Sequence, residues 1–374
     1  MHTTAPAHPG SLTPPRGALF DAGLLLLVVL FLTVSAFALI ELGWQYGESG
    51  GSALEKIHPA TILAAVLLML AAVTQGNPLL AIGEALATHP RVFLYLSGVV
   101  LLMMHAIFVA GLPFTVFIDT FIGPALVLFL LRDLDGERRV NLALLVHALF
   151  LVNTLLGIAE FGLGFRLTPL HIEGETLEEE WRSSALMGHP LSNAMLTGSY
   201  MVLLLSGGAR DLPVWLKPIV FLIAAAGMVV FGGRAATALV ILFVAWHMLR
   251  RIAAVLSGQQ FDPRLVLAGL IGLPVLIGLV LALADAGFFD RFVERLFDDK
   301  GSASTRVEMF ELFRHISWAE LMFGPDRAHI ESLMRHYGLD YGIESFWISM
   351  ILAHGIIAAG TFFLALLVFC IEVV

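Results

Sequence analysis

The sequence predicts an all-α, polytopic membrane protein with about ten or more transmembrane helices and a large, partly helical outer loop. Three observations support this fold class. Hydrophobic residues make up 58% of the 374 residues and charged residues only 14%, and the mean hydropathy is +0.88. Apolar residues cluster in long runs, and the links between runs alternate in basic content. One soluble core cannot bury so much apolar surface, so most of the chain is expected to lie in lipid.

Ten apolar runs are long enough to cross a hydrocarbon layer of ~30 Å. They lie at 18–40, 59–75, 92–111, 113–131, 140–162, 190–208, 214–231, 235–256, 264–286 and 356–374. Residues 1–17 are rich in proline and precede the first run without a small-residue cleavage pattern, which predicts a disordered cytoplasmic tail and a retained anchor. The last run has no basic flank after Val374, so we expect the natural chain to continue.

Basic residues near the ends of the runs set the predicted orientation. They fall in the links after the fourth, sixth and eighth runs, at Arg132, Arg138, Arg139, Arg210, Lys217, Arg250, Arg251 and Arg264. By the positive-inside rule these links and the N-terminus are cytoplasmic. The alternate links therefore face outward, including 163–189 and 287–343. The link 163–189 follows a predicted N-terminal transmembrane bundle over 18–162.

The outer loop over 287–343 has the pattern of amphipathic helices rather than of disorder. Its first part repeats apolar residues at helical spacing, which predicts a helix at the membrane interface. Thr305-Arg306-Val307-Glu308 reads as a capping box that opens a second helix, and Gly324-Pro325 ends it. A cation in the first turn of a helix is unfavourable unless an anion joins it, so Arg306 is expected to have a negative partner.

Three polar strings lie on the predicted outer side. His189-Pro190 opens a span with Asn193 close behind, although polar caps at headgroup level explain this string equally well. Gly233-Arg234 opens another span, where a snorkelling arginine is the alternative to an anion site. Glu344 stands where the chain re-enters the membrane and starts the segment 344–374, and a glutamate favoured by the helix dipole is the alternative there.

Together these strings resemble the superfamily of O-antigen polymerases and O-antigen ligases, over roughly residues 185–374. The resemblance pairs the family's motifs with His189 and Asn193, with Gly233-Arg234, with Arg306 and Gly324, and with Glu344. There are two departures. Gly324-Pro325-Asp326 lacks the second glycine of the family's turn, and Glu344 stands where the ligases have a histidine. The resemblance therefore implies an exopolysaccharide or O-antigen polymerase, with a ligase as the alternative.

This resemblance implies an inverting, metal-independent glycosyltransferase of the bacterial inner membrane, with its catalytic half in 190–286 and its active site facing the periplasm. The donor is a glycan linked to undecaprenyl diphosphate, and no cofactor is needed because the diphosphate is already a good leaving group. Arg234 and Arg306 bind the diphosphate and Glu344 is the general base. The residues expected to bind substrate are His189, Asn193, Arg327, Gly233 and Gly324. Membrane lipid and other polysaccharide-assembly proteins are the further expected partners, and nucleic acid is not one.

Other signals favour different classes of function. Asp133-Leu134-Asp135 has the spacing of a nucleotide-sugar motif, but its short cytoplasmic link is better explained by topology. His315, His329 and His336 fit no compact zinc pattern. Ionisable and polar residues within apolar runs keep a transporter or flippase open as an alternative. These residues are Asp119, His147, Asn153 and Glu160. A non-catalytic assembly component is a third possibility.

Overall fold

The computed structural model describes residues 15, 17–46, 52–111, 114–169, 171–172, 175–176, 181–258, 274, 277–278, 280–297, 302–339, 343 and 345–373. Most of the predicted N-terminal tail, the start of the ninth apolar run and Glu344 lie outside these residues. The chain divides into two compact units. Unit 1 comprises residues 1–145 and 301–374, and unit 2 comprises residues 146–300.

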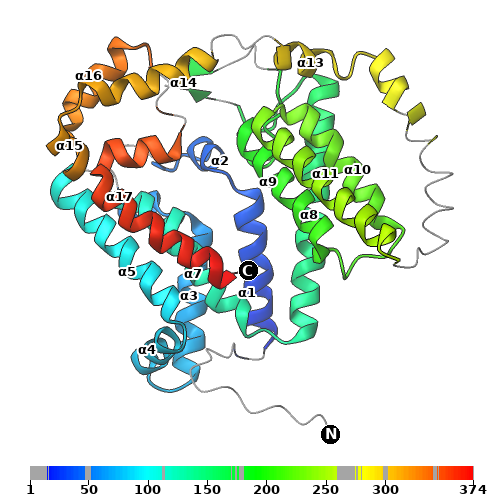
Figure 1. Ribbon diagram of the computed structural model, residues 1–374. Coiled ribbons are helices and arrows are strands. Elements are labelled where there is room, and N and C mark those ends of the chain that lie inside the picture. Colours follow the sequence, from blue (N-terminus) through cyan, green and yellow to red (C-terminus); the bar gives the residue numbers. More distant parts are fainter. Residues whose placement is uncertain are drawn as a thin grey trace, which may run out of the picture. The chain divides into compact units, whose positions relative to one another are not determined.

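The described residues are mainly helical, as predicted (Figure 1). The first part of unit 1 contains α1 (Ala18–Thr33), α2 (Ala36–Glu41), η1 (Ala53–Lys56), α3 (Pro59–Thr74), α4 (Pro78–Thr88), α5 (Pro90–His105), η2 (Ala106–Ala110), α6 (Thr115–Phe117), η3 (Ile118–Ile122) and α7 (Gly123–Arg132). Its second part contains α14 (Ser302–Glu311), η5 (Leu312–His315), α15 (Trp318–Phe323), α16 (Arg327–His336) and α17 (Phe346–Val373).

Unit 2 begins within α8 (Gly136–Leu163), which starts in unit 1. It continues through a hairpin of two short strands, β1 (His171–Ile172) and β2 (Glu175–Thr176). The helices that follow are α9 (Pro190–Leu203), η4 (Leu204–Gly208), α10 (Leu216–Phe231), α11 (Arg234–Leu256) and α13 (Asp290–Phe297). The helix predicted for the start of the outer loop is present as α13.

The protein is a helical membrane protein, but the prediction of ten spans is wrong. Within the described residues four helices are long and apolar enough to cross a bilayer, or five if one bent pair counts as a single span. The four are Pro90–Ala110, Gly136–Leu163, Arg234–Leu256 and Phe346–Val373. The bent pair, α3 with α4, turns by 104°.

Local backbone signals interrupt the regular α-helix in two of the predicted spans. In the first run Ser35 interrupts the helix, and its hydroxyl accepts a hydrogen bond from the Ala38 amide at 3.1 Å to cap α2. In the fourth run a π-helical turn, η3, precedes Gly123-Pro124 at the start of α7. The helix α1 of the first run therefore has only 16 residues and is shorter than a helix that spans a bilayer.

The core of unit 1 is built on α5 and α17, which lie side by side in Figure 1. A Cβ on Gly98 would lie 2.6 Å from the Cβ of Ala365, so glycine allows the two helices to approach closely. The ring of Tyr95 stacks on Phe369 at 4.2 Å, and its hydroxyl donates to the Phe121 carbonyl at 2.8 Å. The buried hydroxyl of Tyr95 is therefore satisfied by backbone.

The loop helices α14 to α16 of unit 1 have a small core of their own. Met309, Leu312, Ile316 and Ile330 are buried in it, together with residues of the first half of α17. The single helix predicted from Thr305 to Gly324 is wrong: the segment forms α14, η5 and α15, and the capping box is made by Ser317 and Glu320 at the start of α15. Because α14 begins at Ser302, Arg306 lies in its second turn rather than its first. The small residues at 302–304 extend the helix by a turn because nothing in their chemistry stops it.

Candidate functional site

The start of α9 has the local structure that the string His189-Pro190 predicts. His189 is extended and precedes the helix, and its Nδ1 atom accepts a hydrogen bond from the Leu191 amide at 3.2 Å. Pro190 occupies the first turn, where a missing amide hydrogen costs nothing. His189 therefore acts as the cap of α9 at the end of the segment that follows α8.

The start of α11 depends on two glycines. Gly232 has a φ of 65°, a left-handed conformation that ends α10 and that residues with a Cβ rarely adopt. A Cβ on Gly233 would collide with the Cβ of Ala194, so glycine lets the start of α11 lie against α9. Arg234 is the first residue of α11. Arg234 thus stands at the positive end of a 23-residue apolar helix, where an anion is favoured.

A second arginine lies beside this helix start. A Cβ on Gly232 would lie 2.9 Å from Cδ of Arg182 and 3.1 Å from the ring of Trp181. Arg182 therefore extends along the backbone that leads into Arg234. Its place in the sequence gives no sign of this, because it lies in the link between α8 and α9 and belongs to no motif. Among the residues around the start of α11, Arg182 is the one that the sequence did not reveal.

Asn193 is fully buried, and its side chain makes three hydrogen bonds. Its Nδ2 donates to the carbonyl oxygens of Ser184 and His189, and its Oδ1 accepts from Nδ2 of Asn153 at 2.8 Å. Asn153 in turn accepts from the Leu186 amide at 3.0 Å. Asn193 therefore fastens the segment before α9 to α8, so the structure places it behind the helix start rather than in an open pocket.

Glu160 anchors the same segment from the end of α8. Only 2% of the residue is exposed, and its carboxyl oxygens accept three backbone amides: Leu167 at 2.8 Å, Ser184 at 3.0 Å and Ala185 at 2.9 Å. These bonds satisfy backbone donors that would otherwise be buried without a partner. Glu160 and Asn193 together fix the chain that carries Arg182 and His189.

Glu160→Gln is expected to destabilise the protein by about 2–4 kcal/mol, because the amide NH2 group would face backbone N–H donors that now meet an acceptor. The measurement is thermal unfolding of the purified protein in detergent. Glu137→Gln is the control, since Glu137 is exposed on the same helix, and it should leave the midpoint unchanged. Equal midpoints for the two variants would contradict the anchoring role of Glu160.

The predicted glycine at the end of α15 has a defined role in unit 1. Gly324 has a φ of 106° and ends the helix. It packs against Gly355, where α17 is interrupted by non-helical backbone with φ 77° and ψ 163°. Beside this contact, the Nδ1 atoms of His105 and His354 lie 3.2 Å apart, and Nε2 of His105 lies 3.2 Å from the Phe323 carbonyl. Helix interruptions of this kind in membrane proteins occur where backbone is covered by protein.

A pocket of about 490 Å³ lies next to this contact in unit 1. Arg327 lines it, as expected for a substrate-binding residue, together with Asp326, Glu331 and Ser349. Nε of Arg327 donates to Glu331 at 2.7 Å, and Asp326 caps α16 by accepting from the His329 amide at 3.1 Å. Apolar residues of η2, α16 and α17 form the rest of the wall. Size and mixed lining suit a small polar ligand such as a sugar.

The predicted clamp of Arg234 and Arg306 is divided between the two units. Arg234 belongs to unit 2 and Arg306 to unit 1. Arg306 lies on α14, and its side chain is outside the described part of the chain. Glu344 is also outside it. The convergence of the two arginines and the role of Glu344 as a base therefore stay predictions.

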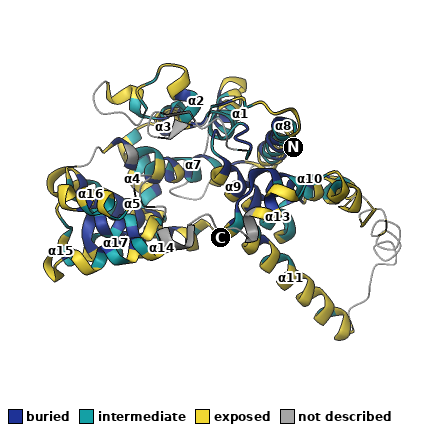
Figure 2. Cartoon of the chain, turned by 90° about the horizontal axis from the view of Figure 1, so that it is seen from above, coloured by how far each residue is buried: buried dark blue, intermediate teal, exposed yellow. Residues whose placement is uncertain are grey.

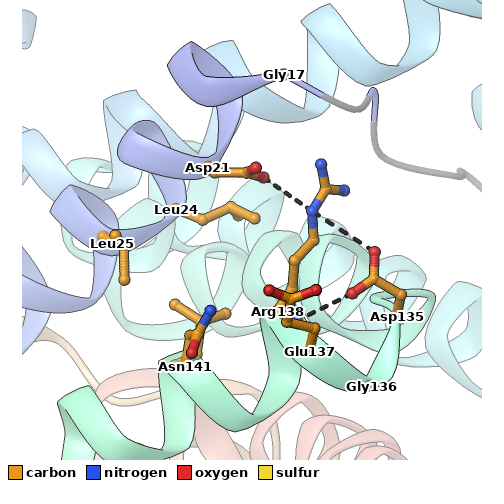
Figure 3. Close-up of a pocket in the computed structure, with 10 residues that line it drawn as sticks. Gly17, Asp21, Leu24, Leu25, Asp135, Gly136, Glu137, Arg138 and Asn141 are labelled. Atoms are coloured by element: carbon orange, nitrogen blue, oxygen red, sulfur yellow. Dashed lines mark hydrogen bonds and ion pairs between the residues drawn. The ribbon is translucent and has the colours of Figure 1, made fainter.

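The acidic string at Asp133-Leu134-Asp135 has a structural role in the described contacts. Asp135 caps α8 by accepting from the Arg138 amide at 3.0 Å. Figure 3 shows the Arg138 guanidinium between Asp21 of α1 and Asp135, and Nε of Arg138 lies 2.8 Å from Asp21 and 3.7 Å from Asp135. These residues line a pocket of about 790 Å³. Asp135 thus has the bonding of a helix cap, in agreement with the explanation by topology.

The polar residues that suggested a transporter form hydrogen bonds within their own unit of the chain. In unit 1, Asp119 accepts from the Tyr46 hydroxyl and the His58 amide, both at 2.8 Å. Burial, followed by the nearby Asp119 carboxylate, raises the pKa of Tyr46, so this hydroxyl keeps its proton and remains a donor. In unit 2, Nδ1 of His147 lies 2.7 Å from the Tyr200 hydroxyl. These contacts are typical of polar groups that hold helices together.

Comparison of the chain with protein-family models, with curated proteins and with solved structures finds no match. Two arrangements in the structure nevertheless carry chemical information. One is the pair of arginines at the start of α11 in unit 2. The other is the pocket beside the Gly324–Gly355 contact in unit 1. Both bring together residues that are distant in the sequence.

Proposed function

We propose that the protein is a glycosyltransferase of the bacterial inner membrane that polymerises oligosaccharide repeat units carried on undecaprenyl diphosphate. The observation that carries the proposal is the position of Arg234, the first residue of an apolar membrane helix, with Arg182 against the preceding Gly232. Two guanidinium groups near a helix N-terminus favour a diphosphate, because charge and hydrogen-bond donors act on the same oxygens.

The reaction needs a nucleophile, a leaving group and a proton acceptor. The hydroxyl oxygen of the acceptor glycan attacks the anomeric carbon of the donor, a new C–O bond forms, and the bond from that carbon to the diphosphate oxygen breaks. The hydroxyl proton passes to Glu344, and undecaprenyl diphosphate leaves with the bonding electrons. Direct displacement inverts the anomeric centre.

Arg234 and Arg306 stabilise the negative charge that grows on the diphosphate as the bond breaks. Arg182 adds a third guanidinium group on the side of Gly232. Gly233 keeps the start of α11 close to α9. His189 and Asn193 fix the segment that precedes α9. These residues would act by fixing the geometry of the diphosphate site before the substrate arrives.

Taken by itself, the pocket of unit 1 suits a sugar. Arg327, Asp326 and Ser349 line it and offer both donors and acceptors to sugar hydroxyls. Gly324 shapes its edge because its positive φ lets the chain turn from α15 into α16. The periplasmic side of the membrane is the proposed location, since lipid-linked repeat units are extended there.

Deletion of the gene tests this proposal. The deletion strain is expected to accumulate single repeat units on undecaprenyl diphosphate at the outer face of the inner membrane. Extraction of the lipids, mass spectrometry and labelling of intact spheroplasts with an impermeant reagent measure both the identity and the side. Accumulation at the inner face would point to a flippase and contradict the proposal. Accumulation of finished polymer on the lipid would point to a ligase and contradict polymerisation.

A further inference from the structure

We propose that the C-terminal end of α11, with η4, forms a binding site for the phosphate of an anionic phospholipid. A pocket of about 480 Å³ lies there in unit 2. Its polar lining consists of Ser206, Trp246, His247, Arg250 and Arg251. The site is separate from the proposed diphosphate site, which lies at the opposite end of the same helix.

The environment of α11 is what a lipid-facing helix requires. The helix is 23 residues long and its apolar window has a mean hydropathy of 1.9, yet only 6% of that window is buried inside the protein. Figure 2 shows α11 exposed along most of its length. Apolar side chains with this exposure are stable only where acyl chains surround them.

The spacing of the basic residues along α11 matches the distance between the two membrane interfaces. Arg250 is sixteen residues after Arg234, which corresponds to about 24 Å along a helix axis. This is shorter than a hydrocarbon layer of ~30 Å, so arginines at both ends reach the interface by extending their side chains. Trp246 is 60% exposed one turn before Arg250, a position typical of the aromatic belt at the membrane surface.

The charge of the pocket favours a phosphate. Among the described residues no carboxyl group forms an ion pair with Arg250 or Arg251. Each guanidinium group can donate two hydrogen bonds to one phosphate. His247 and the Ser206 hydroxyl add donors on the same wall.

The backbone of η4 shapes the other side of the pocket. This π-helical segment contains Gly207 in a non-helical conformation with a φ of 100°. A Cβ on Gly207 would lie 3.8 Å from Nε and 3.9 Å from Nη2 of Arg210, so a third guanidinium group lies close to Gly207, the residue after Ser206. Arginines that only set topology need no cavity, whereas here they line one together with an exposed tryptophan. A basic pocket at the end of a membrane helix is an arrangement that binds anionic lipid headgroups.

The test uses the purified full chain and native mass spectrometry with added phosphatidylglycerol or phosphatidylcholine. The double variant Arg250→Gln, Arg251→Gln is expected to bind phosphatidylglycerol about 30-fold more weakly, because two arginines at an anionic headgroup are lost. Its weak binding of phosphatidylcholine should not change. Arg250→Lys, Arg251→Lys preserves the charge and should keep most of the affinity.

The control is Lys56→Gln, Arg335→Gln, which removes the same net charge from residues outside the candidate spans. It should bind phosphatidylglycerol like the unchanged protein. Equal losses in both double variants would show an effect of net charge alone and overturn the proposal. So would unchanged binding by Arg250→Gln, Arg251→Gln. Competition by inorganic phosphate at the same concentration would identify a site for a free anion and also overturn it.

Discussion

Arg234→Gln is expected to lower the rate of polymerisation by about 100- to 1000-fold, the loss typical when one donor to developing negative charge is removed. Glutamine retains polar atoms but carries no charge, so it cannot stabilise the departing diphosphate. The amount of protein should stay normal, because Arg234 is the first residue of α11 and the helix is started by the backbone of Gly232 and Gly233. Polymer length in cells and turnover of a lipid-linked repeat unit by purified protein measure the effect.

Two further variants distinguish the effect of the charge of Arg234 from the effect of its position. Arg234→Lys should retain part of the activity, since an ammonium group supplies charge without the two-pronged hydrogen bonding of guanidinium. Arg335→Gln removes an exposed arginine of α16 and should have no effect. Full activity of Arg234→Gln at normal protein levels would remove Arg234 from the diphosphate site.

The predicted convergence with Arg306 is tested in the same assay. If both arginines bind one diphosphate, Arg306→Gln should give a similar loss, and the double variant should lose less than the product of the two single effects. Independent, multiplicative losses would indicate two separate sites. This measurement tests whether one diphosphate contacts both arginines.

The helix starts and stops that bear on the proposed site could be predicted from the sequence. His189-Pro190 opens α9, Gly233-Arg234 opens α11, and Gly324-Pro325 ends α15. Each depends on local chemistry: a proline that fits the first turn, a glycine that adopts positive φ, and a cap that satisfies a backbone amide. Local signals of this kind act within a few residues, so they survive without knowledge of the tertiary structure.

The number of spans could not be predicted in the same way. Hydropathy counts apolar side chains, but the length of a helix also depends on where local hydrogen bonds end it. The run 18–40 is divided at Ser35, where α1 ends and α2 begins. This break lies within apolar sequence, where a window average is insensitive to it.

Contacts between residues that are far apart in the chain could not be predicted from the sequence either. Arg182 lies beside Gly232, and His105 beside His354, although both pairs are far apart in the chain. Asn193 was expected to bind substrate, whereas its buried hydrogen bonds make it a support for the adjoining segment. Residue type alone does not show which face of a helix a side chain occupies or what covers it.

Gly355→Ala is expected to destabilise the protein by about 3–5 kcal/mol, the largest effect we expect of a single methyl group in this chain. The backbone at Gly355, with φ 77° and ψ 163°, lies in a region that only glycine occupies readily. A Cβ there would collide with the Gly324 amide and lie 2.6 Å from the Met322 carbonyl oxygen and 2.7 Å from the Phe323 carbonyl carbon. These are backbone atoms, so no side-chain movement can relieve the clash.

Gly360→Ala on the same helix is the matched control. Nothing lies within 4 Å of a Cβ at Gly360, which is in regular helix, so alanine should leave stability unchanged or raise it slightly. Thermal unfolding in detergent should show a drop of about 10 °C for Gly355→Ala alone. Since the clash pushes α15 away from α17, the variant should also expose the loop helices to limited proteolysis. Identical unfolding of both variants would mean that α17 does not bend at Gly355 in the folded protein. The packing that forms the pocket lined by Arg327 would then be contradicted as well.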